Sequence, residues 1–216
     1  SQFDTEEQLF LIECLKRYSY LRASEYQYGQ KKLYSKFLKK YPLWKNDSFI
    51  FKIFKTEASY SDNFFNDFWL TNNLKNECKQ NIEEHQEYFD VIKNYIFLDD
   101  YIGSGNTITN YLRPLLDKYP ELRTKSFIIL TLYLTNSGKL ALENFATDNN
   151  INLDIIYYKS GDKFFKEGKY YSGQQLQNKL QMYNKICDDK EISLFHRFGY
   201  ENIQSLFTIE NNTPND

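Results

Sequence analysis

The amino-acid sequence predicts an α/β protein built around a parallel β-sheet, and two observations support this fold class. Mostly apolar segments of strand length recur at residues 49–54, 95–98, 126–134 and 152–158. Polar turns and segments with apolar residues at helical spacing separate them. Strands that alternate with helices in this way are typical of right-handed βαβ units with parallel strands. The continuous apolar runs also suit strands that are covered on both faces.

The N-terminal part of the chain has a helical pattern instead. Residues 4–41 keep apolar side chains at helical spacing behind an acidic first turn, and a second helical stretch, residues 28–41, ends before Pro42. We therefore expect an N-terminal helical accessory region at residues 1–45 and an α/β domain at residues 46–216. The chemistry is expected to lie in the α/β domain.

The most informative motif spans residues 95–107. Four apolar residues lead into Asp99 and Asp100, and a glycine-containing turn follows after two further residues. The residues of this turn, called here the 103–107 loop, are Gly103, Ser104, Gly105, Asn106 and Thr107. Apolar side chains from residue 108 to 116 then recur at helical spacing. A strand, a glycine turn and a helix N-terminus together form an anion site, because free backbone N–H groups and the positive end of the helix dipole point to one place.

Two carboxylates beside such an anion site suit a sugar diol or a hydrated Mg²⁺ ion. The motif therefore indicates a site for a ribose 5-phosphate group. The alternative is an ordinary α/β turn, since many strands of α/β proteins end in Asp and turn through Gly-Ser-Gly. Asp100 is expected on an open edge of the sheet, where replacement by Asn would leave the fold intact.

Residues 95–107 resemble the fingerprint of type I phosphoribosyltransferases, in register and without a gap. The resemblance implies a Rossmann-like, phosphoribosyltransferase-like core. It also implies that Asp99 and Asp100 hold the ribose hydroxyls of phosphoribosyl pyrophosphate (PRPP), and that the 103–107 loop holds the 5-phosphate. Mg²⁺ is the implied cofactor; it would arrive with the pyrophosphate, with Asp99 and Asp100 as its contacts.

A second strand-turn-helix unit precedes this motif. The strand at residues 49–54 leads into a polar turn that, by the same resemblance, holds the pyrophosphate; Ser59, Ser61 and Asn63 are the candidates. An ordinary helix start with Ser61 or Asp62 as N-cap explains the same residue types. Ligands of parallel sheets bind at the carboxyl ends of the strands. The turns at residues 55–63, 99–107 and 135–138 are therefore expected along one edge.

The C-terminal residues 199–216, with their Asn-Asn-Thr-Pro-Asn sequence, resemble the end of a divergent phosphoribosyltransferase-like family associated with bacterial conflict and phage-defence loci. The resemblance covers residues 48–216. It implies an effector of anti-phage defence that acts on a phosphoribosyl-containing small molecule, PRPP or a nucleotide. It also implies a protein partner encoded by a neighbouring defence gene.

The sequence departs from the housekeeping phosphoribosyltransferases in two respects. Those enzymes carry a long flexible lid with Arg or Lys, whereas residues 76–92 here predict a polar helix, and no base-selecting element is recognisable. Two functions therefore stay open. One is a phosphoribosyltransferase or nucleotide-degrading enzyme, and the other is a non-catalytic nucleotide sensor that uses the same phosphate site.

The composition argues against several classes of partner. The net charge of −2 gives no bulk attraction to nucleic acid or to an anionic membrane, and neither is expected as a partner. The three cysteines, Cys14, Cys78 and Cys187, lie far apart and match no zinc-site spacing. No secretory signal opens the sequence. These features predict a cytoplasmic protein and leave its oligomeric state open.

Overall fold

The structure is a computed structural model. The residues that it describes are 2–53, 60–74, 76–79, 82–194, 196–198 and 203–209. The chain divides into two compact units. The sheet unit comprises Ser24–Ser160, and the terminal unit comprises Ser1–Ala23 together with Gly161–Asp216.

The sheet unit is organised around a five-stranded sheet with the strand order β3-β2-β4-β5-β6. The strands are β2 (Ser48–Lys52), β3 (Cys78–Lys79), β4 (Asn94–Ile102), β5 (Ser126–Thr135) and β6 (Asn152–Gly161). β2 pairs in parallel with both β3 and β4, and β4 pairs in parallel with β5. The parallel α/β fold predicted from the sequence is confirmed, and the strand that carries Asp99 and Asp100 is the central one.

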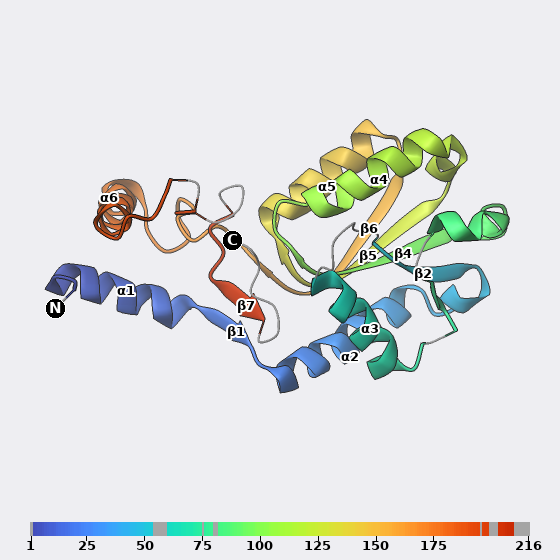
Figure 1. Cartoon of the computed structure of the whole chain (residues 1–216), viewed down its shortest axis with the longest axis horizontal. Helices are drawn as coiled ribbons and strands as arrows, with labels where there is room; N and C mark the ends of the chain where they lie inside the picture. Colours follow the sequence, from blue (N-terminus) through green and yellow to red (C-terminus); the bar gives the residue numbers. More distant parts are fainter. Residues whose placement is uncertain are drawn as a thin grey trace. The chain divides into compact units, whose positions relative to one another are not determined.

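Helices cover both faces of this sheet (Figure 1). α4 (Asn106–Lys118) and α5 (Asn136–Asp148) lie on one face, and α2 (Ala23–Lys40) and α3 (Tyr60–Asn72) lie on the other. The contact between α2 and the sheet is close. A Cβ atom on Gly29 would lie 3.0 Å from the Tyr158 ring and 3.1 Å from the Leu132 side chain. The helices predicted at the N-terminus therefore include one that forms part of the cover of the sheet.

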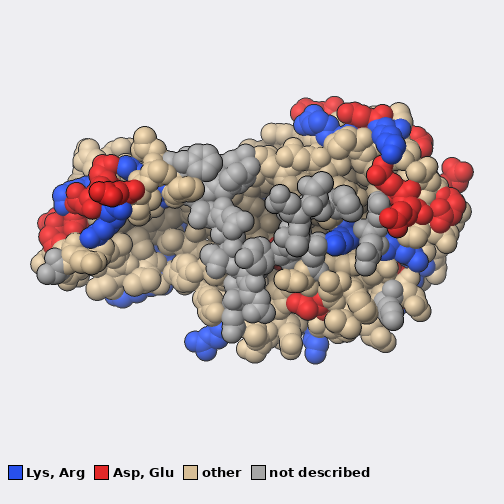
Figure 2. Space-filling view, in the orientation of Figure 1, with Lys and Arg blue, Asp and Glu red and all other residues tan. Residues whose placement is uncertain are grey.

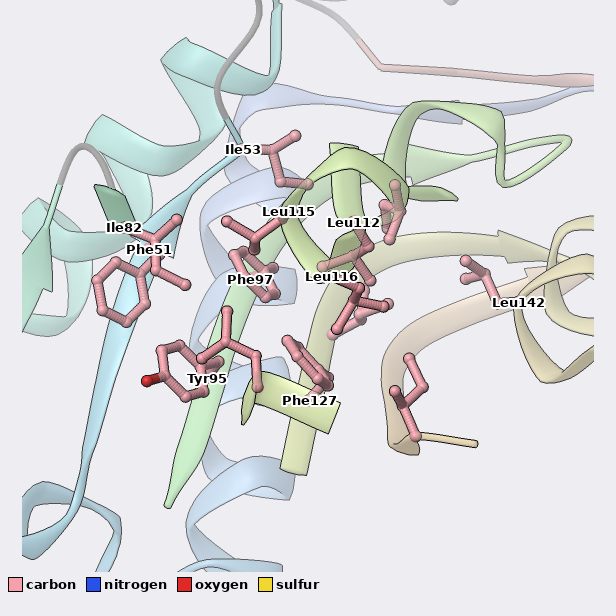
Figure 3. Packing of buried hydrophobic residues seen from close by; sticks show 14 of the residues in the cluster. Phe51, Ile53, Ile82, Tyr95, Phe97, Leu112, Leu115, Leu116, Phe127 and Leu142 are labelled. Atoms are coloured by element: carbon pink, nitrogen blue, oxygen red, sulfur yellow. The ribbon is translucent and has the colours of Figure 1, made fainter. Parts of the chain in front are cut away.

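The core between the sheet and α4 is aromatic on the sheet side and aliphatic on the helix side. The fully buried rings of Phe97 and Phe127 stack with their centroids 6.2 Å apart. Leu112, Leu115 and Leu116 of α4 pack in the same cluster (Figure 3). Burial of this apolar stripe fixes α4 against the sheet, which leaves its N-terminus at the carboxyl end of β4.

The helix predicted at residues 76–92 is wrong. Cys78 and Lys79 form β3 at the edge of the sheet beside β2. A 3₁₀ helix, η2 (Ile82–Tyr88), follows and is interrupted at His85, whose φ of −127° is not helical. Pairing with β2 satisfies backbone groups of this segment, and Ile82 is fully buried in the core. Tertiary contacts therefore override the helical propensity of the described residues of this segment.

Two helices begin earlier than the sequence predicts. α3 begins at Tyr60, so Ser61 and Asp62 lie in its first turn and neither is the N-cap. α5 begins at Asn136, directly after β5, and its N-cap is Thr135. The predicted turn at residues 135–138 is therefore the end of a strand and the first turn of a helix.

The described part of the terminal unit contains two helices and a two-stranded parallel sheet. Its elements are α1 (Thr5–Arg17), β1 (Ser19–Leu21), α6 (Gly173–Asp189) and β7 (Phe207–Ile209), with β1 paired to β7. Asp4 and Glu7 form a capping box at the start of α1. Phe10 of α1 is fully buried and lies in one cluster with Phe164 and Tyr171. This unit thus has a hydrophobic core of its own.

The compact units divide the chain after Ala23 and after Ser160, whereas the sequence places one boundary between residues 45 and 46. The packing of α2 on the sheet accounts for the difference.

Lys and Arg side chains lie next to Asp and Glu side chains on the described part of one face of the molecule, in keeping with the small net charge (Figure 2). Among the described residues no helix is long and apolar enough to cross a membrane.

Candidate functional site

The acidic pair lies inside β4: Asp99 is three residues, and Asp100 two residues, before its last residue, Ile102. Asp99 pairs with Thr131 and Ile102 pairs with Leu134 of β5, so the ladder continues past both carboxylates. Successive strand residues point to opposite faces. Asp99 therefore shares the face of α4 and α5, and Asp100 shares the face of α2 and α3.

Both carboxylate residues are buried. Asp99 is 4% exposed and Asp100 is 5% exposed, so the prediction of an open edge at Asp100 is wrong. The reason is that the strand extends beyond the pair and helices cover both faces. A ligand held by these side chains would be largely enclosed by protein.

The 103–107 loop connects β4 directly to α4. Gly105 is the N-cap residue of α4 and has a φ of +82°, a backbone conformation that a residue with a Cβ atom rarely adopts. Gly105 has no side chain with which to cap the helix, and the Ser104 hydroxyl accepts a hydrogen bond of 3.3 Å from the Asn106 N–H. The N–H groups at the start of α4 lie beside a turn that ends the central strand. This is the arrangement that binds phosphate at helix N-termini.

Hydrogen bonds through Thr135 connect the 103–107 loop to the start of α5. The Thr135 hydroxyl donates a short hydrogen bond to the Gly103 carbonyl and accepts one of 2.9 Å from the Gly138 N–H. A Cβ atom on Gly138 would lie 2.5 Å from the Gly103 carbonyl oxygen, so only glycine fits there. The turns at residues 99–107 and 135–138, which the sequence predicts on one edge, are therefore in direct contact.

On the opposite face of β4, Asp100 lies near Tyr26 of α2. The Tyr26 hydroxyl donates to Asp67 Oδ2 of α3 at 3.4 Å. Burial raises the pKa of Tyr26, and the charges of Asp67 and Asp100 raise it further. Tyr26 therefore stays a protonated donor at neutral pH. Sequence patterns did not indicate Tyr26 or Asp67, because both are distant from Asp100 along the chain.

Comparison with known families assigns the chain to one of them. A family model, PRTase-CE, matches residues 1–216, the whole chain. The chain belongs to the PRTase-CE family. It is thus a phosphoribosyltransferase-like protein, as the resemblance at residues 95–107 implied.

A solved structure with a similar fold is Helicobacter pylori xanthine-guanine-hypoxanthine phosphoribosyltransferase. The two chains are 15% identical, with a TM-score of 0.42, over 66% of this chain and 85% of that chain. A comparison with curated proteins finds no match.

The loop assigned to pyrophosphate in this PRTase-CE protein is described only in part. Ser59 lies outside the described residues, and Ser61 lies in the first turn of α3 with a side chain that the structure does not describe. Asn63 is exposed on the same helix. The pyrophosphate role of these three residues stays a prediction.

The donor set suits a metal that is shared with a ligand. Among the described residues no group of three or more His, Cys, Asp or Glu side chains could hold a metal ion by itself. Mg²⁺ keeps several waters and commonly binds one or two carboxylates together with substrate phosphates. Asp99 and Asp100 fit that mode as contacts to a hydrated ion.

The three cysteines are not candidate nucleophiles. Burial raises the pKa of Cys14 to about 11 and that of Cys78 to about 12, and it also raises the pKa of Cys187. These thiols stay protonated at neutral pH, and a protonated thiol is a poor nucleophile.

Proposed function

We propose that this PRTase-CE protein binds a phosphoribosyl ligand, PRPP or a nucleotide, with Mg²⁺ at the carboxyl end of β4, and that it acts in bacterial anti-phage defence. The observation that supports the ligand is the order of a buried acidic pair, a glycine turn and a helix N-terminus with glycine as its N-cap, all at the carboxyl end of the central strand. The acids suit ribose hydroxyls, and the turn suits the 5-phosphate. The defence role follows from the family resemblance alone.

In this proposal the backbone N–H groups of the 103–107 loop hold the 5-phosphate, together with the hydroxyls of Ser104 and Thr107. Asp99 and Asp100 accept hydrogen bonds from the ribose hydroxyls. The Tyr26 hydroxyl, whose pKa is raised by burial and by the charge of Asp100, donates to Asp67.

The reaction that suits this site is displacement at C1 of the ribose. The bond between C1 and the leaving group breaks, the leaving group departs with the electron pair, and positive charge develops on the ribose ring. An acceptor base or water then forms the new bond to C1 with its own lone pair and releases its proton to solvent. The protein contributes by fixing the geometry and by placing carboxylates near that charge, without a protein nucleophile. When bound, Mg²⁺ supplies charge neutralisation on a pyrophosphate leaving group.

A second candidate function is a nucleotide sensor that binds without turnover. The described parts of the segment between β2 and β4 form α3, β3 and η2. A catalytic phosphoribosyltransferase encloses its reaction with a mobile lid in the corresponding segment, according to the resemblance. The regular structure of these described parts favours the sensor over the enzyme.

Turnover distinguishes the two functions. We expect the purified chain with Mg²⁺ either to consume PRPP, NAD or a nucleotide, as an enzyme, or to bind one of them unchanged, as a sensor. Asp100→Asn should abolish turnover, because it removes a charge that faces the ribose. Product formation measured by chromatography checks this.

The matched control is Asp90→Asn, which removes the same charge from an exposed position just before β4 and should leave turnover unchanged. Full activity of Asp100→Asn would refute the site. The defence role is tested by phage plating on cells that express the wild type or Asp100→Asn with the neighbouring genes. Equal protection by both would refute a defence role for this site.

A further inference from the structure

Thr135 joins two elements that both end at the carboxyl edge of the sheet. It is the last residue of β5 and the N-cap of α5, and it is 4% exposed. Its hydroxyl uses one lone pair to accept from Gly138 N–H, as an N-cap does. The same hydroxyl donates a hydrogen bond to the carbonyl of Gly103 in the loop after β4. A single hydroxyl therefore bridges α5 and the 103–107 loop.

This bridge sets the orientation of one peptide group. In a trans peptide the carbonyl and the following N–H point in opposite directions, and no cis peptide occurs among the described residues. Because the Gly103 carbonyl points to Thr135, the Ser104 N–H points away from Thr135. Ser104 is partly exposed, whereas Gly103 and Gly105 on either side of it are buried.

Packing holds the same peptide in place. A Cβ atom on Gly138 would lie 2.5 Å from the Gly103 oxygen and 3.0 Å from the Ile102 oxygen. From the other side, a Cβ atom on Gly105 would lie 3.2 Å from the Gly138 oxygen. The loop and the first turn of α5 are thus in backbone-to-backbone contact, which leaves the Gly103 peptide little room to rotate.

We infer that Thr135 is a positioning residue for the phosphate site: its hydroxyl fixes the Gly103 carbonyl and so turns the Ser104 N–H toward the phosphate of the ligand. The inference rests on the proposed function, since it assumes that the 103–107 loop binds phosphate. Thr135 acts through the peptide and touches no ligand. An anion-binding amide that is oriented before the ligand arrives binds more tightly, because no reorientation accompanies binding.

The test compares two probes, inorganic phosphate and ribose 5-phosphate, whose binding is followed by NMR titration with Mg²⁺ present. Thr135→Val keeps the shape of the side chain and removes the hydroxyl. It should lower the affinity for both probes by a similar factor of about ten. Thr135→Ser restores the hydroxyl and should restore both affinities. Asp100→Asn, by contrast, should weaken ribose 5-phosphate and leave inorganic phosphate unchanged.

Ser48→Ala is the control for a purely structural effect. The Ser48 hydroxyl is equally buried, donates to Asp47 Oδ1 at 3.0 Å and accepts from Asn94 Nδ2 at 2.9 Å, at the opposite end of the sheet. Its loss should lower the melting temperature and leave both affinities unchanged. Unchanged affinities in Thr135→Val would overturn the inference and leave the proposed function standing. No binding of either probe to the wild type would refute the proposed phosphate site itself.

A measurement on the wild type covers the case in which Thr135→Val does not fold. On addition of inorganic phosphate, the amide resonance of Ser104 should shift together with the amides at the start of α4. If those amides shift and that of Ser104 does not, the inference is wrong. The readout depends on the direction of one N–H group, which a general loss of stability would not change.

Discussion

At the residue scale, Gln30 is a buried polar side chain whose role the local sequence does not show. It lies on α2 with no exposed surface, and neither its amide oxygen nor its amide nitrogen has a hydrogen-bond partner within 3.5 Å among the described residues. The amide is near enough to the Tyr26 hydroxyl to lower the pKa of that group slightly, against the larger rise caused by burial. An unsatisfied buried amide costs about 1–3 kcal/mol of folding free energy.

We therefore expect Gln30→Leu to raise the melting temperature. Leucine has a similar volume and needs no hydrogen bond, so a gain of about 1 kcal/mol would correspond to roughly 2–4 °C for a chain of this size. Differential scanning calorimetry measures the shift. Gln27→Leu, on an exposed position of the same helix, should change the melting temperature little. A lower melting temperature for Gln30→Leu would mean that the amide is satisfied in the folded protein.

Sequence patterns nominate candidate site residues only where their signals are local. Asp99, Asp100 and the 103–107 loop lie within nine consecutive residues, and their order alone predicts a phosphoribosyl site. The burial of Asp100 and its proximity to Tyr26 depend on how α2 packs against β4. Such contacts join residues more than 70 positions apart, and no local pattern indicates them.

At the element scale, the junction between the 103–107 loop and α5 depends on Gly138. A side chain at this position meets backbone oxygen atoms of β4 and the loop, which cannot move aside as a flexible side chain would. Overpacking of this kind costs about 1–3 kcal/mol. The junction also places the loop, so the same substitution should affect ligand binding.

Gly138→Ala is expected to lower the melting temperature by roughly 2–12 °C, on the scale of 2–4 °C per kcal/mol, and to weaken ribose 5-phosphate binding as well. Thermal unfolding and calorimetric titration measure the two effects. Ser137→Ala, one residue earlier in the same turn, should change neither. If Gly138→Ala lost stability and kept full affinity, the junction would be structural only and would not position the loop.

The elements of the βαβ core could be predicted because their signals are strong. Long apolar runs predicted β4, β5 and β6, and helical periodicity predicted α4. The segment of residues 76–92 could not be predicted in the same way. Its two-residue strand is too short for a periodic signal, and its 3₁₀ helix is determined by burial of Ile82 against the sheet. The early start of α5 was missed because Thr135 serves both as a strand end and as an N-cap.

At the scale of the whole molecule, the two compact units each have a core, and the candidate site is built entirely from the sheet unit. Asp99, Asp100, the 103–107 loop and Thr135 all lie within Ser24–Ser160. Sequence patterns predicted a helical N-terminal region and an α/β domain, and they did not predict that the first and last segments of the chain join in one unit. Pairing of β1 with β7 is a contact between the two ends of the chain, and strands of three residues give little local signal.

The central claim is that the carboxyl end of β4 binds a phosphoribosyl group, and ligand-dependent thermal stability tests it most directly. The melting temperature of the whole chain is measured with Mg²⁺ and, in turn, PRPP, ribose 5-phosphate, NAD, ATP and GMP. A ligand at 100 times its dissociation constant stabilises the folded state by about 2.7 kcal/mol, or roughly 5–10 °C for a chain of this size. We predict such a shift for at least one phosphoribosyl ligand, and its loss in Asp100→Asn. No shift with any of these ligands, or a shift that Asp100→Asn retains in full, would contradict the claim.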